Sequence, residues 1–178
     1  MYSIYILEPK LNKLNIFNNT NKIGNLYWND IDIYPIDSII RKIKKYTFTH
    51  HIERLMYLSN WFLINQIDPK EVYRIFMEWT IDAYDWVMVP NVYGMGQYNG
   101  KMLTRVYFSS SNYIRKMGNY KGEWCEIWDV LYYNFINKNI KLLQHNYATS
   151  RQVNHWLNKK NKEEILSLAK KYQKKYII

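Results

Sequence analysis

The chain has 178 residues, of which 48% are hydrophobic, so it is long enough to fold as one domain with a substantial core. Lysine and arginine outnumber aspartate and glutamate by 25 to 15, and the resulting charge of +10 favours polyanionic partners such as nucleic acid. No run of about eighteen uncharged apolar residues occurs, so we expect no membrane span. The first residues lack the pattern of a secretory signal, and the single cysteine excludes an internal disulfide. Both features favour a reducing, intracellular compartment.

The first third of the chain shows one helix start and one amphipathic pattern. Residues 1–30 are rich in asparagine and weakly patterned, so we expect irregular structure with at most a short strand or turn. Asp37 stands just before an apolar run, and its carboxylate predicts the N-cap of a helix. From His50 onward, apolar residues recur every three or four positions, which predicts a helix with His51 and Arg54 one turn apart.

The strongest local signal is the start of the next helix. Asp68-Pro69-Lys70-Glu71 combines an acidic cap, a proline at the first helical position and a glutamate three residues after the cap. The apolar run that ends at Pro90 is too β-branched to continue a helix comfortably, so we expect a break there. Residues 91–101 contain three glycines, which indicates a loop.

Helical patterns fill the rest of the chain. Ser110 or Ser111 caps a predicted helix that runs to Met117, and further helices are predicted over 123–137, 147–158 and 162–176. The fold class is therefore all-α, a single helical domain with irregular connections. Along the sequence we distinguish an irregular segment over 1–30, a main helical portion over 31–160 and a basic C-terminal helix over 161–178.

Two motifs carry a family resemblance. The first is His50-His51-Ile52-Glu53-Arg54-Leu55-Met56, and the second runs from Asp82 through Pro90-Asn91 to Gly94-Met95. Their order, with the aromatic residues between and after them, resembles the prokaryotic photolyases and cryptochromes that carry an iron–sulfur cluster. The resemblance covers the C-terminal, FAD-binding part of those proteins, from about Asn12 to about Trp156. It implies that the chain begins partway through that domain and that FAD is the cofactor.

The resemblance also implies a catalytic group. His51 matches a histidine that donates a proton during repair of 6-4 lesions in DNA, and His50 matches its partner. Histidine suits proton transfer because its ordinary pKa lies near neutrality. Tyr107 and Tyr113 match two tyrosines that line the lesion pocket, where a phenol can stack on a base and donate a hydrogen bond. A structural role for each of these four residues is the alternative.

Three further residues match positions around the flavin in the same family. Arg54, Asp82 and Asn91 match groups that hold the polar edge of the cofactor. A buried ion pair that only joins two helices would explain Arg54 and Asp82 equally well.

The chain also departs from the family pattern. Cys125 alone remains near the cluster cysteines, so we expect no iron–sulfur cluster and no metal site. The aromatic pair that carries electrons to the flavin falls on Ile75 and Phe76, which predicts a lost route or a different one through Trp79 or Trp28. Met88 replaces an acidic residue close to the flavin, and a thioether carries no charge.

Three functions stay open at this stage. The first is a photolyase or cryptochrome-like protein that repairs DNA with 6-4 damage and uses FAD, with a second chain supplying the antenna domain and the rest of the flavin site. The second is a non-enzymatic, basic nucleic-acid-binding protein built on the same helical domain, with DNA as the expected partner. The third is a structural or assembly protein that buries an apolar face against another chain.

Overall fold

The protein is all-α in the part of the chain that the structure describes. The structure is a computed structural model, which describes residues 10–23, 25–98 and 106–176. Within these ranges the chain forms helices and loops, and its β-type pairing is an isolated bridge between Asn21 and Ile67. The predicted fold class is confirmed. None of the described helices is long and apolar enough to cross a membrane.

The helices follow one another with short connections. The α-helices are α2 (Tyr34–Tyr46), α3 (Asn60–Ile64), α4 (Pro69–Trp79), α5 (Asp85–Val89), α6 (Ser111–Gly118), α7 (Trp124–Lys138), α8 (Ile140–Leu143), α9 (Tyr147–Leu157) and α10 (Lys162–Tyr176). Two segments are π-helical, η3 (Glu53–Ser59) and η4 (Pro90–Gly96), and two are short 3₁₀ turns, η1 (Leu11–Lys13) and η2 (Asn25–Trp28). The irregular character predicted for residues 1–30 holds for the described part of that segment, while residues 1–9 lie outside the description.

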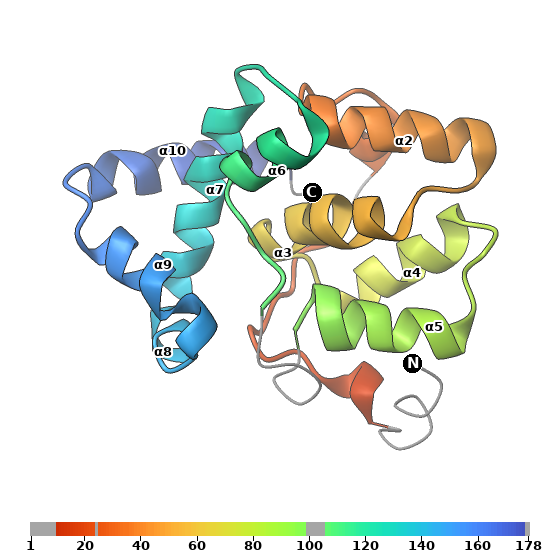
Figure 1. Ribbon diagram of the computed structural model, residues 1–178, viewed down its shortest axis with the longest axis horizontal. Coiled ribbons are helices and arrows are strands. Elements are labelled where there is room, and N and C mark those ends of the chain that lie inside the picture. The colour runs from red at the N-terminus through yellow and green to blue at the C-terminus, as the bar shows by residue number, and fades with distance from the viewer. Residues whose placement is uncertain (1–9, 24, 99–105, 177–178) are drawn as a thin grey trace.

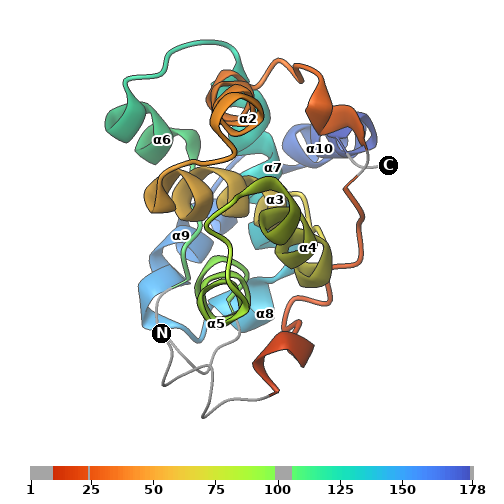
Figure 2. The same ribbon diagram turned by 90° about the vertical axis from the view of Figure 1, so that its right-hand side faces the viewer.

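One central helix organises the arrangement. Residues 51–64 form a continuous helix that contains η3 and α3, and it lies between α2 on one side and the α4–α5 pair on the other (Figures 1 and 2). Helix α7 packs against α3, and α10 lies along α7. The ring centroids of Trp61 and Trp128 are 5.1 Å apart, and those of Trp61 and Tyr176 are 5.3 Å apart. The basic C-terminal helix thus shares its core with the central helix.

Helix α2 begins earlier than predicted. Its first residue is Tyr34, Pro35 lies in its first turn, and Ile33 occupies the N-cap position. Asp37 is therefore inside the first turn, and the prediction that it caps the helix was wrong. Its Oδ1 accepts the backbone N–H of Ile31 at 2.9 Å. The carboxylate thus fixes the segment that precedes the helix. An anion is also favoured at this position, because the partial positive charge of the helix N-terminus extends through the first turn.

The expected break at Pro90 does not occur. Helix α5 continues into η4, so the loop predicted over 91–101 was wrong for its described part, residues 91–98, which are helical through Gly96. Pro90 lacks a backbone N–H and disfavours ordinary α-helical hydrogen bonding, and a wider π-turn accommodates that loss. The turn of η4 closes where Gln97 donates its backbone N–H to the Val92 carbonyl at 2.7 Å.

The remaining predicted helices are confirmed within one residue at each end. Asp68 caps α4 and accepts the Lys70 N–H at 2.9 Å. Helix α6 begins at Ser111 as expected, but its cap comes from elsewhere. The Asp129 carboxylate on α7 accepts the Ser111 N–H and hydroxyl, each at 2.8 Å. A contact across 18 residues of sequence thus replaces a local serine cap.

Candidate functional site

The two adjacent histidines stand at the start of the central helix. The Nδ1 atom of His50 accepts the backbone N–H of Ile52 at 3.1 Å. His50 therefore satisfies one of the free N–H groups at the helix start, which is a structural role. His51 is the first helical residue, and both imidazoles are exposed.

A small hollow lies beside His51. Its lining comes from the central helix, from α4 and from the α5–η4 helix: His51, Arg54, Leu55, Ser59, Phe76, Met88 and Asn91. Its volume is about 10 Å³, which is room for about one water molecule. The hollow is thus too small for a ring system. These residues could therefore form only one wall of a site that holds a larger ligand.

Arg54 and Asp82 form a two-point ion pair behind the hollow. Arg54 Nη1 donates to Asp82 Oδ1 at 3.0 Å, and Nη2 donates to Oδ2 at 2.6 Å. The guanidinium carbon also lies 5.7 Å from the centroid of the Phe48 ring. Parallel hydrogen bonds and a ring face fix the orientation of the guanidinium plane.

Two polar atoms at the hollow have no partner. Arg54 Nε and Asn91 Oδ1 are buried, and neither makes a hydrogen bond with the described residues. One is a donor and the other an acceptor, and both side chains line the hollow. Buried polar groups without partners are rare, because each costs about 1–3 kcal/mol. A ligand edge that offers one acceptor and one donor would satisfy both.

The environment of His51 favours its neutral form. Partial burial of the His51 side chain lowers its pKa, and the nearby Arg54 and His50 lower it further. The shift favours the uncharged imidazole over the imidazolium. A neutral ring carries one proton to donate and one nitrogen that accepts.

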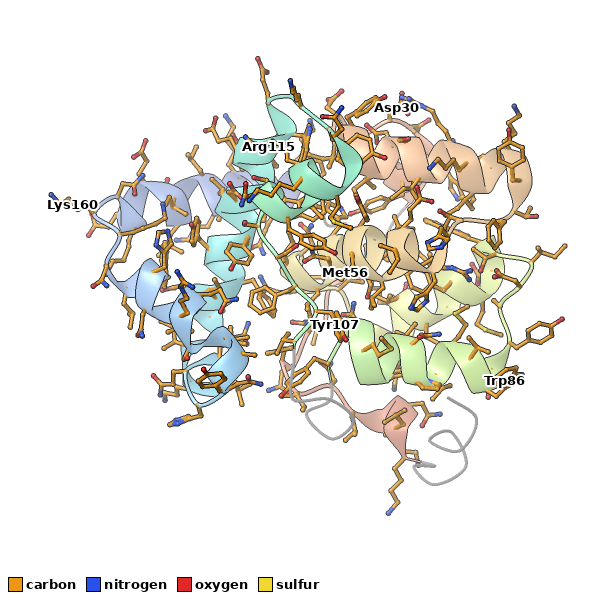
Figure 3. The ribbon with its side chains drawn as sticks, viewed as in Figure 1. Asp30, Met56, Trp86, Tyr107, Arg115 and Lys160 are labelled. Carbon is orange, nitrogen blue, oxygen red and sulfur yellow. The ribbon has the colours of Figure 1, made fainter. Side chains whose placement is uncertain are left out.

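The two predicted pocket tyrosines lie outside the lining of this hollow. Tyr107 is half-buried on the extended segment that leads to α6, and Figure 3 shows it at the opposite end of α5 from Trp86. Tyr113 is half-buried on α6 and close enough to Tyr57 that the two phenols interact electrostatically. Burial, reinforced by the phenols of Tyr120 and Tyr113, raises the pKa of Tyr57 to about 12. The structure thus brings His51, Arg54, Asp82 and Asn91 together and places the tyrosines elsewhere.

Two of the residues that depart from the family pattern lie at the same place. Phe76 and Met88 both line the hollow. One helical turn after Phe76 on α4, the ring of Trp79 contacts that of Trp28, with centroids 4.9 Å apart. Trp79 is buried, whereas Trp28 is 42% exposed. The two indoles considered for a different electron route are therefore in contact and connect the surface to the helix beneath the hollow.

Several supporting residues were not anticipated. Thr80 Oγ1 lies 3.4 Å from Arg54 Nη1 and donates to the Phe76 carbonyl at 2.8 Å. Gln97 Nε2 donates to the hydroxyl of Ser59 at 2.9 Å and to its carbonyl at 3.1 Å. Thr80 lies 26 residues from Arg54 and Gln97 lies 38 residues from Ser59, so no local sequence pattern predicts these two contacts. No three His, Cys, Asp or Glu side chains within the described ranges are arranged to hold a metal ion.

The helical fold agrees with the relatives of this chain. The fold fits the C-terminal helical domain of photolyases, and the chain is related to that class. It is 32% identical over 171 residues to a protein from Agrobacterium fabrum named (6-4) photolyase. The match covers 88% of this chain but 34% of the photolyase, so the chain spans about a third of that relative.

A second relative matches over nearly its whole length. It is an uncharacterized protein of Acanthamoeba polyphaga mimivirus, 43% identical over 125 residues, which are 65% of this chain and 96% of the viral protein. The chain therefore belongs to the same family as this viral protein. No family model matches the chain.

Proposed function

We propose that this chain forms one wall of an FAD site in a photolyase-like protein that repairs 6-4 lesions in DNA, and that a second chain supplies the remainder of that site. The observation that carries the proposal is the pair of unpartnered polar atoms, Arg54 Nε and Asn91 Oδ1, of two residues that line the hollow beside His51. FAD, when bound, would supply light-driven electron transfer to the lesion.

The residues present fit one edge of a flavin ring. Arg54 Nε–H would donate to a ring oxygen or nitrogen, and Asn91 Oδ1 would accept from a ring N–H. The pair with Asp82 holds the guanidinium in place during this contact. Leu55, Phe76 and Met88 surround these groups with apolar surface, which excludes water from the contact.

His51 would transfer the proton that the lesion requires. In its imidazolium form it would give up the proton from one ring nitrogen, and the lowered pKa makes that imidazolium a stronger acid. His50, which binds the Ile52 N–H through Nδ1, fixes the start of the helix and with it the backbone of His51. We assign His50 as a positioning residue and His51 as the proton donor.

Exposed apolar side chains around the hollow support a second chain as the cover. Phe48 is 46% exposed and contacts Arg54, Ile52 is 38% exposed beside His51, and Ile81 is 78% exposed. Ile81 donates its backbone N–H to Thr47 at 2.8 Å, so it lies next to Phe48. Grouped apolar surface of this kind is typical of an interface. The photolyase relative is about three times as long as the matched segment. The proposed second chain would correspond to the part of that relative which lies outside the match.

Flavin binding tests the proposal. FAD is titrated into the purified chain, with and without a complementary N-terminal photolyase segment, and flavin fluorescence is measured. Arg54→Met and Asn91→Leu should each weaken binding by roughly 10-fold or more, because each leaves a buried polar group of the ligand unpaired. Asn154→Leu, at an exposed position on α9, serves as the matched control. Equal affinities for all variants, or no binding under either condition, would refute the flavin site.

Repair of a defined oligonucleotide tests the assignment of His51. His51→Ala should abolish repair of a 6-4 photoproduct in the flavin-loaded complex while leaving DNA affinity unchanged. His50→Ala should reduce repair by a smaller factor and also lower the melting temperature, because it removes a helix cap. Full repair by His51→Ala would exclude this histidine as the proton donor.

A further inference from the structure

A second cavity in the described part of the chain lies away from the His51 hollow. It has a volume of about 540 Å³ and opens between the end of α6 and the start of α7. Its walls are residues 115, 116 and 119–122 together with Cys125, and it shares no lining residue with the hollow. This volume lies within the range of about 300–1,000 Å³ that is typical of ligand sites.

The cavity is strongly cationic. Arg115, Lys116 and Lys121 line it, no carboxylate does, and all three side chains are exposed. None of the three takes part in an ion pair within the part of the chain that the structure describes. The carboxylate of Asp129 lies close enough to affect Arg115, but it accepts two hydrogen bonds from Ser111. Three cations without paired anions favour an anionic ligand.

The cavity borders the start of α7 at Gly122 and Cys125. Helix α7 has 15 residues, and its dipole places partial positive charge at this end. The dipole adds to the charge of the three cationic side chains.

One wall of the cavity is an aromatic ring. The centroid of Tyr120 lies 5.5 Å from that of Tyr34 and 6.1 Å from that of Tyr57, and both contacts are edge-on. The ring is half-buried and borders the cavity. Aromatic rings beside cations are characteristic of nucleic-acid surfaces, where bases stack while phosphates pair with the charges.

We propose that this cavity binds a phosphate of a nucleic-acid backbone. Arg115 would contact two phosphate oxygens through its planar guanidinium, and Lys116 and Lys121 would neutralise the adjacent charge. Tyr120 would contact the sugar or base next to that phosphate. The inference deepens the proposed action on DNA and rests on it, but it does not depend on flavin binding. Figure 3 shows Arg115 on α6 beside the first turns of α7.

Cys125 provides a direct readout of occupancy. It is the single cysteine of the chain, it lines the cavity, and burial raises the pKa of its thiol. The rate of its alkylation by iodoacetamide, followed at alkaline pH by mass spectrometry, should fall at least fivefold when the full chain is saturated with a short DNA duplex. Inorganic pyrophosphate is the second probe, and it distinguishes a free phosphate compound from a polymer.

Charge variants provide an independent measurement. The variant Arg115→Gln/Lys116→Gln/Lys121→Gln is compared with Lys170→Gln/Lys171→Gln/Lys174→Gln, which removes the same charge from exposed positions on α10. Affinity for the duplex is measured by fluorescence anisotropy between about 50 and about 200 mM salt. The cavity variant should lower the slope of log affinity against log salt by about 2–3, since each lost phosphate contact contributes about 0.9. The α10 variant should change the slope by less than about 1.

The outcomes separate this inference from the proposed function. Protection of Cys125 by DNA together with a selective loss in the cavity variant supports the site. DNA that binds while Cys125 reacts at its free rate, or equal losses in both charge variants, overturns the site and leaves action on DNA standing. Protection by pyrophosphate without any duplex binding overturns both the backbone assignment and the proposed action on DNA. If neither probe protects Cys125, the site is overturned.

Discussion

Arg54 and Asp82 share two parallel hydrogen bonds, yet they are buried to different degrees. The side chain of Arg54 is 8% exposed, whereas that of Asp82 is 39% exposed. The buried guanidinium therefore depends on the carboxylate to offset most of its lost hydration, whereas the carboxylate is still partly hydrated by water. Removing Asp82 and removing Arg54 should therefore destabilise the protein to different extents.

We expect Asp82→Ala to destabilise the protein more than Arg54→Met. The first change leaves a buried positive charge without its partner, which costs about 3–5 kcal/mol, whereas the second leaves a carboxylate that water can solvate. Urea denaturation measures both free energies of unfolding. Arg74→Met, which breaks an exposed pair with Glu78, should cost less than about 1 kcal/mol. A cost for Asp82→Ala no greater than that of Arg74→Met would contradict the buried role of the pair.

The lowered pKa of His51 predicts a pH-dependent stability. The unfolded chain has the ordinary histidine pKa of 6.5, and the folded chain has a lower one. Between these two values the unfolded state binds more protons, so the free energy of unfolding decreases as the pH falls through 6.5. The decrease ends below the folded pKa, and it should be absent in His51→Gln.

A mutation can separate the effect of burial on the His51 pKa from the effect of Arg54. Burial is its largest cause, and Arg54 is the next. Arg54→Met should therefore raise the pKa of His51 partway toward its ordinary value, as followed by the imidazole proton signals in an NMR titration. His145→Gln, at an exposed position in the turn after α8, is the control for the stability measurement. A His51 titration that does not change in Arg54→Met would show that the two charges do not interact.

The crossing of the two π-helical segments leaves no room for a side chain at Gly96. A Cβ added there would lie 2.1 Å from Ser59 Oγ and 2.9 Å from Ser59 Cβ. Gly96→Ala should therefore destabilise the protein by at least about 1–3 kcal/mol, because the backbones of both segments must separate. Chemical denaturation measures the loss.

Gly118→Ala is the companion variant for this prediction. The nearest atoms to its added Cβ belong to the Tyr120 ring, the end of a half-buried side chain that can rotate. Its cost should be clearly smaller than that of Gly96→Ala. Equal costs for the two variants would mean that the crossing at Ser59 is not tightly packed.

The contact between Trp28 and Trp79 predicts an electron route into the flavin-loaded protein. An indole is oxidised more readily than a phenyl ring, so Trp79→Phe should slow light-driven bleaching of the flavin by an external thiol at least tenfold. Trp86→Phe, at an exposed indole on α5, should leave the rate within about twofold of wild type. Flavin affinity is measured for both variants, so that lost binding is not taken for lost electron transfer. Unchanged bleaching in Trp79→Phe would exclude this route.

Local signals were sufficient wherever a helix is controlled by its own residues. The cap at Asp68 and the proline after it specify the start of α4 through contacts within three residues. The apolar spacing from Trp124 onward specifies α7, because one stripe of that helix faces the core. The resemblance carried by the His50-His51 and Pro90-Asn91 motifs also selected four residues that meet in space: His51, Arg54, Asp82 and Asn91.

Local signals failed where a distant segment determines the backbone. Pro90 ends an α-helical pattern in isolation, but the helix continues as η4 because it packs against η3 at Ser59 and Gly96. Ser111 was expected to cap α6, but the Asp129 carboxylate on α7 does so. The unpaired donor and acceptor at the hollow appear only when the helices are assembled, since burial is a property of the whole packing.

The sequence by itself determined the helical class, most helix boundaries and the membership of one small set of polar residues. Each of these depends on interactions between residues a few positions apart, or on a motif that the chain carries intact. The tertiary structure alone decided the size of the hollow, the asymmetric burial of Arg54 and Asp82, and the cationic cavity at Arg115 and Lys121. These features arise from contacts between helices that are distant in the chain. The energies of such contacts cannot be inferred from any short segment of the sequence.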